Sequence, residues 1–378
     1  MLSFWEKKSF TNYDLVIIGG GLTGMFCALS YNIKKPKSKI LILERGIFSD
    51  GASTKNAGFA TFGSLSEIMA DNKKLTDDLV FDLVEKRVLG LELLKKTIPK
   101  KYLNIKNYGG YELIFDNNDS LLNMMDKYNK LLHPIFNDNI FHESSNRIVS
   151  LGFSDKKITN LIFNPYDSQI DIGETFYALR KILLSKGINI INGANVLEYN
   201  SNLDCNKVFV NYNDQIIKFK STLLAVCSNA SAKKWFLKED IQPGRGMIIV
   251  TKPIKNLRIK GSFHYNEGFN YFRNFKKRVI IGGARNIDFK TENTESFGIN
   301  QKIKKSLIND LHDFILPNND FDIDMEWSGI MAFGSTKEPI VKKINENAVL
   351  AVRLGGIGVS IASIVGKEAS ELLLKDID

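Results

Sequence analysis

The chain has 378 residues, 44% of them hydrophobic and 25% charged, which is the composition of an ordinary soluble globular protein of about two domains. Lysine and arginine number 51 against 42 acidic residues, but the resulting net charge of +9 is spread along the chain. Because no dense basic tract with interleaved aromatic residues occurs, a nucleic-acid partner is disfavoured.

The first predicted element lies in the uncharged run of residues 15–33. This run follows a mixed-charge start, with Asp14 directly before it, and it lacks the Leu-rich centre and the cleavage site of a signal peptide. Its four glycines also make a poor membrane-spanning helix. We therefore expect no membrane segment here and no membrane partner.

Residues 15–43 instead predict a strand, a turn, a helix and a second strand. Residues 15–18 form a short apolar run, as in a parallel strand that is covered on both faces. Beyond the turn, apolar residues recur at helical spacing, and the stretch KSKILILERG supplies a second apolar strand that ends at Glu44.

The turn carries Gly19, Gly21 and Gly24 in the spacing G-x-G-x-x-G. The first glycine permits a tight turn, the second lets a pyrophosphate approach the backbone, and the third lets helix and strand pack closely. Leu22 and Thr23 then open the helix, whose free N–H groups and partial positive charge attract phosphate.

Glu44 stands at the end of the second strand, at the distance from the glycine turn that is typical of a dinucleotide-binding unit. A carboxylate in this position accepts hydrogen bonds from the ribose hydroxyls of an adenosine, so the segment predicts dinucleotide binding. The carboxylate also argues against a 2′-phosphate, although the neighbouring Arg45 weakens that argument. A glycine turn that serves packing alone is the alternative.

The next segment, GASTKNAGFATFGS at residues 51–64, is small, polar and glycine-rich. It offers hydroxyl, amide and backbone donors to a pyrophosphate and a ribityl chain. A flexible surface loop is the alternative, but the apolar residues in the second half of the segment are too many for free solvation. The residues predicted to wrap the cofactor are Ala52, Ser53, Thr54, Asn56, Ala57 and Gly58.

Residues 348–374 form a second unit of strand, glycine turn and amphipathic helix, near the opposite end of the chain from the first. An NAD-type domain is normally complete within one contiguous half of its chain, so a late glycine turn suits a larger, two-ended cofactor. Amides at this helix start would stabilise the charge that develops on a reduced flavin. A glycine-capped helix without a ligand is the alternative. The predicted contact residues are Gly355, Gly356, Ile357, Gly358, Val359 and Ser360.

With these three segments, the chain resembles the FAD-dependent D-amino-acid-oxidase-like superfamily, which includes glycine, sarcosine and γ-glutamylputrescine oxidases. The last group is the most similar, on the loop GASTKNAGF and on a Trp-containing start like SFWEKKSF. The resemblance extends over almost the whole chain, and it implies non-covalently bound FAD. In residues 170–199 it also implies a backbone contact from Val196 to adenine.

The resemblance implies an α/β (α+β overall) architecture, in which an antiparallel-sheet substrate domain is inserted into an interrupted Rossmann-like FAD domain. We expect the discontinuous FAD domain to comprise residues 1–65, 151–237 and 326–378. We expect residues 66–150 and 238–325 to form the substrate domain.

The implied activity is the oxidation of a C–N bond in an amine or amino-acid-like substrate, by hydride transfer to flavin N5, with oxygen or another compound as electron acceptor. This chemistry needs orientation and a dry pocket more than acid–base groups. The weak catalytic candidates are therefore Lys55, near the flavin loop, and Tyr271 and Arg273, which share one face of a predicted strand. An exposed lysine, a half-buried tyrosine and a surface arginine are the structural alternatives. Arg245 and Arg285 are weaker candidates for binding an acidic group.

Two features depart from the family pattern. Family members that bind an amino-acid carboxylate often have an arginine near the position of Met331 and Ala332, so a carboxylate anchor is doubtful there. No histidine precedes His133 and no cysteine follows Cys227, so the usual covalent flavin attachments are not expected.

Two other functions remain open: a flavin domain that acts in tRNA modification, and a flavin-binding protein without turnover. The three cysteines have no CxxC spacing, and the four histidines complete no zinc pattern, so no metal site is predicted. A reducing cytoplasm is the expected location.

Overall fold

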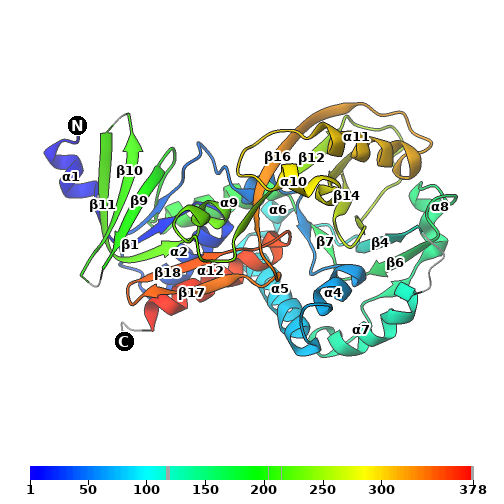
Figure 1. The fold of residues 1–378 in the computed structure, drawn as a ribbon, viewed down its shortest axis with the longest axis horizontal. Coiled ribbons are helices and arrows are strands. Elements are labelled where there is room, and N and C mark those ends of the chain that lie inside the picture. The colour runs from blue at the N-terminus through cyan, green and yellow to red at the C-terminus, as the bar shows by residue number, and fades with distance from the viewer. Residues whose placement is uncertain (116–119, 203, 214, 376–378) are drawn as a thin grey trace.

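Two eight-stranded sheets, one toward each end of the molecule, carry the fold (Figure 1). The computed structural model describes residues 1–115, 120–202, 204–213 and 215–375. A small two-stranded sheet pairs β3 with β7. Its strands are β3 (Phe59–Ala60) and β7 (Ser168–Gln169).

In the first sheet, five strands run parallel, in the order β18-β11-β1-β2-β8. β17 joins the β18 edge antiparallel, and β9 and β10 extend the N-terminal half of the long strand β11. The strands are β1 (Asn12–Ile18), β2 (Ile40–Leu43), β8 (Asn189–Ile191), β9 (Asn195–Ser201), β10 (Asn206–Tyr212), β11 (Gln215–Val226), β17 (Ile340–Asn345) and β18 (Ala348–Val352).

The central strand β1 is covered on both faces, as the apolar run predicts. Leu15 and Ile17 belong to the apolar cluster beneath α2 and α12, whereas Val16 and Ile18 belong to the cluster on the other face of the sheet. This two-sided burial explains why the strand has no polar alternation. α2 (Leu22–Lys34) and α12 (Gly358–Leu374) pack closely on each other, although they come from opposite ends of the chain.

The second sheet has the order β16-β12-β15-β14-β13-β4-β6-β5. Its pairs are antiparallel, except that β13 and β4 run parallel. The strands are β4 (Gly110–Ile114), β5 (His142–Glu143), β6 (Asn160–Asn164), β12 (Gln242–Thr251), β13 (Ser262–Tyr265), β14 (Asn270–Phe275), β15 (Arg278–Gly283) and β16 (Ile323–Phe333).

The remaining helices surround the two sheets (Figure 1). Among the described residues, no helix combines the length and the apolar character that crossing a bilayer requires. These helices are α1 (Phe4–Phe10), α3 (Ala52–Lys55), α4 (Leu65–Asn72), α5 (Asp77–Thr97), α6 (Lys100–Leu103), α7 (Ser120–Phe136), α8 (Ile148–Leu151), α9 (Ile172–Ser185), α10 (Phe289–Glu292) and α11 (Gln301–Asp310).

The predicted domain boundaries and the sheets differ at two strands. β6 lies within residues 151–237, and most of β16 lies within residues 326–378, yet both strands pair in the second sheet. The chain passes between the two sheets several times, and the local sequence does not mark the residues at which it passes from one sheet to the other. The exact boundaries stay a prediction, and residues 376–378 of the last segment lie outside the described residues.

Candidate functional site: a cleft between two glycine turns

A cleft of about 1130 Å³, including space open to solvent, lies where the parallel strands of the first sheet end. Ile18, Leu43, Cys227 and Leu354 line it, and they lie at or just beyond the carboxyl ends of β1, β2, β11 and β18. Ligands of open α/β sheets bind at this edge.

The first glycine turn forms one wall of the cleft. Gly19 has a φ of +113°, and a Cβ at this position would lie 2.6 Å from the carbonyl oxygen of Cys227. A Cβ on Gly24 would overlap the carbonyl oxygen of Gly19, so only glycine allows α2 to start so close to β1. Gly21, the N-cap residue of α2, supplies no side chain to cap the first amides of the helix.

Glu44 lies buried at the floor of this turn, with only 5% of its surface exposed. Its Oε2 accepts a hydrogen bond from the Gly20 N–H at 2.9 Å, and its Oε1 accepts one from the Gly46 N–H at 2.8 Å. Oε1 also accepts from the Asp50 N–H at 3.3 Å, whereas Oε2 keeps a further lone pair, and since the residue lines the cleft, Glu44 can also accept from a ligand hydroxyl.

The second glycine turn forms the opposite wall. Gly355, Gly356, Gly358 and Val359 line the same cleft at the start of α12, whose N-cap residue, Ile357, makes no side-chain cap. Two helix starts whose N-cap residues give no side-chain cap therefore face one cleft with their first turns.

The segment predicted to wrap the cofactor begins with the short helix α3. Ala52, Ser53 and Asn56 line the cleft, and Ser53 Oγ accepts a hydrogen bond from the Leu22 N–H at 2.9 Å. Asn56 donates to the carbonyls of Ala52 and Ser53 at 3.1 and 2.9 Å, which fixes the end of the helix.

The far end of the cleft contains polar residues that were not predicted. Lys234 donates to the carbonyl of Val196 at 2.7 Å and lies 4.1 Å from the centre of the Trp235 ring. Burial, together with the nearby Arg45, lowers the pKa of Lys234. Arg45 itself donates to Ser231 at 3.0 Å. The strand order could have indicated Lys234 and Ser231. They follow β11, which pairs with β1, and the carboxyl end of β11 must therefore lie at the cleft.

Most of the predicted cofactor residues come together in this cleft. Those that line it are Gly19, Gly21, Leu22, Thr23, Glu44, Arg45, Ala52, Ser53, Asn56, Val196, Gly355, Gly356, Gly358 and Val359. Gly24, Thr54, Ala57, Gly58, Ile357 and Ser360 do not line it. Ser360 is fully buried and donates to the carbonyl of Thr61, behind the cleft wall.

The three weak catalytic candidates lie near the junction of the two sheets and do not line the cleft. The backbone carbonyl of Lys55 accepts a hydrogen bond from the Trp327 indole at 2.9 Å, which joins α3 to β16. Tyr271 packs edge-on against Phe59 at 5.4 Å, and burial raises the pKa of Tyr271 to about 12.

Arg273 is a buried structural residue, with 3% of its surface exposed. Its guanidinium donates to the carbonyls of Gly58 and Ile170 at 2.5 and 2.9 Å, so it joins the flavin loop to the second sheet. Burial lowers the pKa of Arg273 to about 10. The i, i+2 spacing placed Tyr271 and Arg273 on one face correctly, but it could not show that protein carbonyls occupy that face.

Met331, near which the family resemblance made a carboxylate anchor doubtful, lines the cleft from β16. Arg245 makes a bidentate ion pair with Glu292 at 2.8 and 3.0 Å. Arg285 lies against the Phe289 and Phe333 rings, with centroid distances of 4.9 and 4.4 Å. Of these two arginines, Arg245 thus already has a carboxylate partner.

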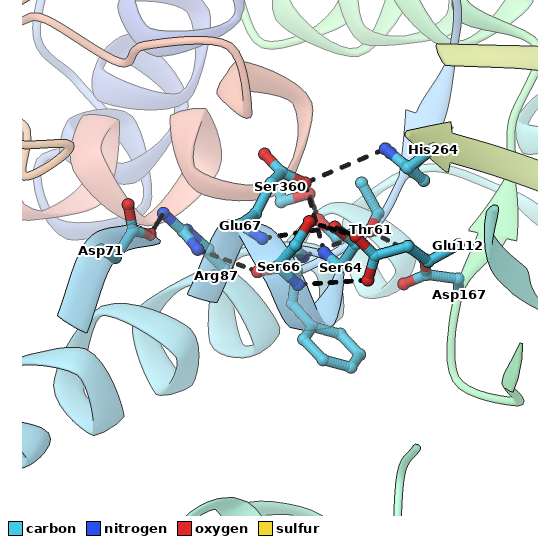
Figure 2. A network of polar contacts seen from close by, with 12 residues as sticks. Thr61, Ser64, Ser66, Glu67, Asp71, Arg87, Glu112, Asp167, His264 and Ser360 are labelled. Carbon is cyan, nitrogen blue, oxygen red and sulfur yellow. Dashed lines mark hydrogen bonds and ion pairs between the residues drawn. The ribbon is translucent and has the colours of Figure 1, made fainter. Parts of the chain in front are cut away.

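Figure 2 shows a network of polar side chains whose labelled residues do not line the cleft. Thr61 donates to Asp167 at 2.8 Å, and Glu112 accepts from the backbone N–H of Ser66 at 3.1 Å. With Ser360 bonded to Thr61, the network links the start of α12 to the second sheet. Sequence analysis missed it because its acidic residues are far apart in the chain.

Burial and neighbouring charges shift the pKa values of the carboxyl groups in this network. Burial is the main cause that raises the pKa of Glu112 and of Asp167 to about 7, and the charge of Glu67 adds to it. Glu67 behaves differently: burial opposes its ionisation, yet Lys337 and His264 leave its pKa below the ordinary value. At neutral pH the network therefore holds titrating carboxyls near an ionised one.

The cleft fits a long, two-ended dinucleotide. Nothing within 4 Å would meet a Cβ on Gly355 or Gly356, so the second turn leaves open space for a ligand, while the first turn has the pyrophosphate spacing. Glu44 offers a ribose acceptor, and the second helix start offers amides to the ring at the other end. Fold and site together define a flavin-dinucleotide-binding protein.

The sequence profile of the FAD dependent oxidoreductase family matches residues 14–372, so the chain belongs to that family and uses FAD. It is thus an FAD-dependent oxidoreductase. No curated protein matches it in sequence.

Solved structures of low sequence identity share the fold. Glycine oxidase from Geobacillus kaustophilus has 16% identity and a TM-score of 0.75, covering 96% of this chain and 95% of its own. L-proline dehydrogenase from P. horikoshii has 18% identity and a TM-score of 0.74, with 97% and 94% covered. L-α-glycerophosphate oxidase from Mycoplasma pneumoniae, with FAD bound, has 16% identity and a TM-score of 0.71, with 96% and 94% covered.

Proposed function

We propose that this enzyme oxidises the C–N bond of a small amine or amino-acid-like substrate. One observation carries the proposal: the two glycine turns, one from each end of the chain, line a single cleft that Met331 of the second sheet also lines. The names glycine oxidase and L-proline dehydrogenase support a nitrogen-containing substrate. When bound, FAD supplies the two-electron acceptor.

The chain's own residues orient the substrate and exclude water. Met331 presents an apolar side chain to the cleft, and Phe59 and Tyr271 form an aromatic contact between the flavin loop and the second sheet. A dry, apolar wall favours binding of the neutral amine, the form that can be oxidised, over the ammonium ion. Because Met331 cannot bind a carboxylate, we place no carboxylate anchor at this position.

FAD is proposed to bind without a covalent link. Cys227 is the cysteine that lines the cleft, but its thiol hydrogen bonds with Cys27, and this bond together with burial raises the pKa of the Cys227 thiol. A protonated thiol is a poor nucleophile. Acid precipitation should therefore release the flavin into the supernatant, and flavin retained in the pellet would contradict this.

The anaerobic absorbance spectrum of the FAD-loaded protein tests the activity. Primary amines, secondary amines, amino acids and 2-hydroxy acids are added in turn. We expect at least one nitrogen compound to bleach the flavin band while the hydroxy acids leave it unchanged. Bleaching by hydroxy compounds alone would reject the C–N proposal. No bleaching by any member, with dithionite still reducing the flavin, would favour a binding protein without turnover.

A further inference from the structure

The N-terminal helix α1 exposes aromatic side chains that the fold does not use. Phe4, Trp5 and Phe10 are 67%, 69% and 60% exposed, and no residue of the helix is buried. Figure 1 shows α1 at the outer end of the molecule, beside β11 and away from the second sheet. Large apolar side chains gathered on a free element mark an interaction surface.

This helix is nevertheless held in place. Ser3 and Glu6 form a reciprocal capping box, with hydrogen bonds of 2.7 and 3.2 Å. Thr11 Oγ1 donates to the carbonyl of Lys7 at 2.6 Å, and Lys39 Nζ donates to the carbonyl of Ser9 at 2.5 Å. So short a helix is not stable alone, and these bonds fix its backbone although none of its residues is buried.

Lysines surround the helix. Lys7 and Lys8 lie in its last turn, and Lys39 reaches Ser9. The backbone N–H of Lys220 donates to the carbonyl of Thr11 at 2.8 Å, and Lys218 projects from the same face of β11. The carboxylates nearest in sequence already have roles. Glu6 caps the helix, and Asp14 accepts from the Lys39 N–H at 2.7 Å.

Although the sequence predicts no membrane partner, we propose that α1 and these lysines form a docking surface for an anionic lipid bilayer, with the aromatic side chains in the headgroup region and the lysines on the lipid phosphates. Phenylalanine and tryptophan on a short helix, flanked by lysines, have the chemistry of an interfacial anchor. Paired lysines attract an anionic surface. The alternative, a second copy docked by two-fold symmetry, would place lysines against lysines.

The lipid surface leaves the cofactor cleft free. The cleft lies at the carboxyl ends of the parallel strands, whereas α1 precedes the amino end of β1. Docking through α1 would therefore keep the cleft directed away from the bilayer. The proposal is independent of which substrate is oxidised.

The experiment is co-sedimentation of the full-length, FAD-loaded protein with vesicles. Phosphatidylcholine alone is compared with phosphatidylcholine containing phosphatidylserine. We expect retention at least about tenfold higher on the anionic vesicles, and a decrease as salt is raised. The variant F4S/W5S/F10S and the variant K7E/K8E should each lose about tenfold or more of this retention.

Matched control variants lie on the second-sheet side of the molecule. Phe297→Ser removes another exposed aromatic ring, and K276E/K277E reverses another exposed lysine pair; both should keep vesicle retention. All variants should keep their flavin content and melting temperature, because α1 contributes no buried residue.

Three outcomes overturn the proposal. Equal retention on both vesicle types, or none, rejects an anionic lipid surface. A dimer in sedimentation that the F4S/W5S/F10S variant converts to a monomer, without vesicle retention, assigns α1 to a second copy. Salt-sensitive tRNA retention that the same variants abolish, again without vesicle retention, assigns it to nucleic acid.

Discussion

Glu44 shows how one side chain can shape a turn and still serve a ligand. Glutamine has nearly the same shape, but its NH₂ group replaces one of the two carboxylate oxygens. Both of these oxygens now accept backbone N–H groups, and an NH₂ group cannot. We expect Glu44→Gln to weaken FAD binding about tenfold, or about 1.4 kcal/mol. Titration of the apoprotein by flavin fluorescence measures this, with exposed Glu198→Gln as the control; an unchanged Kd would remove Glu44 from the site.

Gly356 separates the needs of the fold from those of the cofactor. A Cβ there would meet no atom within 4 Å, and its φ is not in the left-handed region. We expect Gly356→Ala to keep the melting temperature of the apoprotein, within about 0.5 kcal/mol of stability. The methyl group would project into the cleft, so FAD affinity should fall about tenfold or more. Equal FAD affinity would mean that the cofactor does not approach the second turn.

Asp167 gives the network a pH dependence. Its folded pKa of about 7 is raised from 3.8, so its contribution to stability is complete below pH 3.8 and is lost as the pH rises through about 7. Asparagine keeps the hydrogen bond from Thr61 and cannot ionise. We expect the free energy of unfolding of Asp167→Asn to exceed that of the parent by about 1–3 kcal/mol at pH 8, and this advantage to become smaller at pH 5. Urea unfolding at both pH values measures it; a pH-independent difference would contradict an ionisable Asp167.

At the scale of elements, the contact between α2 and α12 closes the cleft. A Cβ on Gly366 of α12 would overlap the Thr23 carbonyl oxygen of α2. We expect Gly366→Ala to separate the helices and to cost about 2–4 kcal/mol, visible as a lower melting temperature and weaker FAD binding. Gly173→Ala in α9, which meets only the Asp171 side chain at 3.5 Å, should be neutral or stabilising. If Gly366→Ala and Gly173→Ala changed the melting temperature and FAD binding equally, the contact between α2 and α12 would not be what stabilises the cleft.

The elements of both cofactor turns were predictable because their signals are local. Glycine spacing, an apolar strand and a helical repeat together specify β1 and α2, and again β18 and α12. Membership of the second sheet was less predictable. β6 is separated by a helix-rich stretch from β4, its partner, and only long-range packing decides their pairing.

The candidate site divides in the same way. Gly19, Glu44 and Gly356 follow from motif spacing, and all of them line the cleft. The buried network of Glu67, Glu112, Asp167 and His264 could not be predicted, because scattered polar residues show no period, and their partners are set only when the two sheets pack. For Arg273 the sequence predicted the face of the strand that it shares with Tyr271, but not the backbone carbonyls to which it donates.

For the whole molecule, FAD should act as a link between distant parts of the chain. Glu44 and Gly356 line one cleft, but they follow β2 and β18, which lie far apart in the chain and are connected in the first sheet through β1 and β11. We expect FAD at about 100 times its Kd to add about 2.7 kcal/mol of stability and to sharpen the unfolding transition. Calorimetry of apo and FAD-loaded protein tests this. Two separate transitions, of which FAD shifts only one, would show that it binds to one part alone.

The position of α12 at the late end of the fold has a consequence for biosynthesis. A ribosome that has produced β1, α2 and β11 has made a sheet whose β18 edge is still bare, and whose glycine turn faces an incomplete cleft. Cofactor capture must wait until α12 has emerged. Flavin loading thus distinguishes chains that have formed α12 from chains that have not, and nascent chains must keep an apolar sheet edge protected until β18 is made.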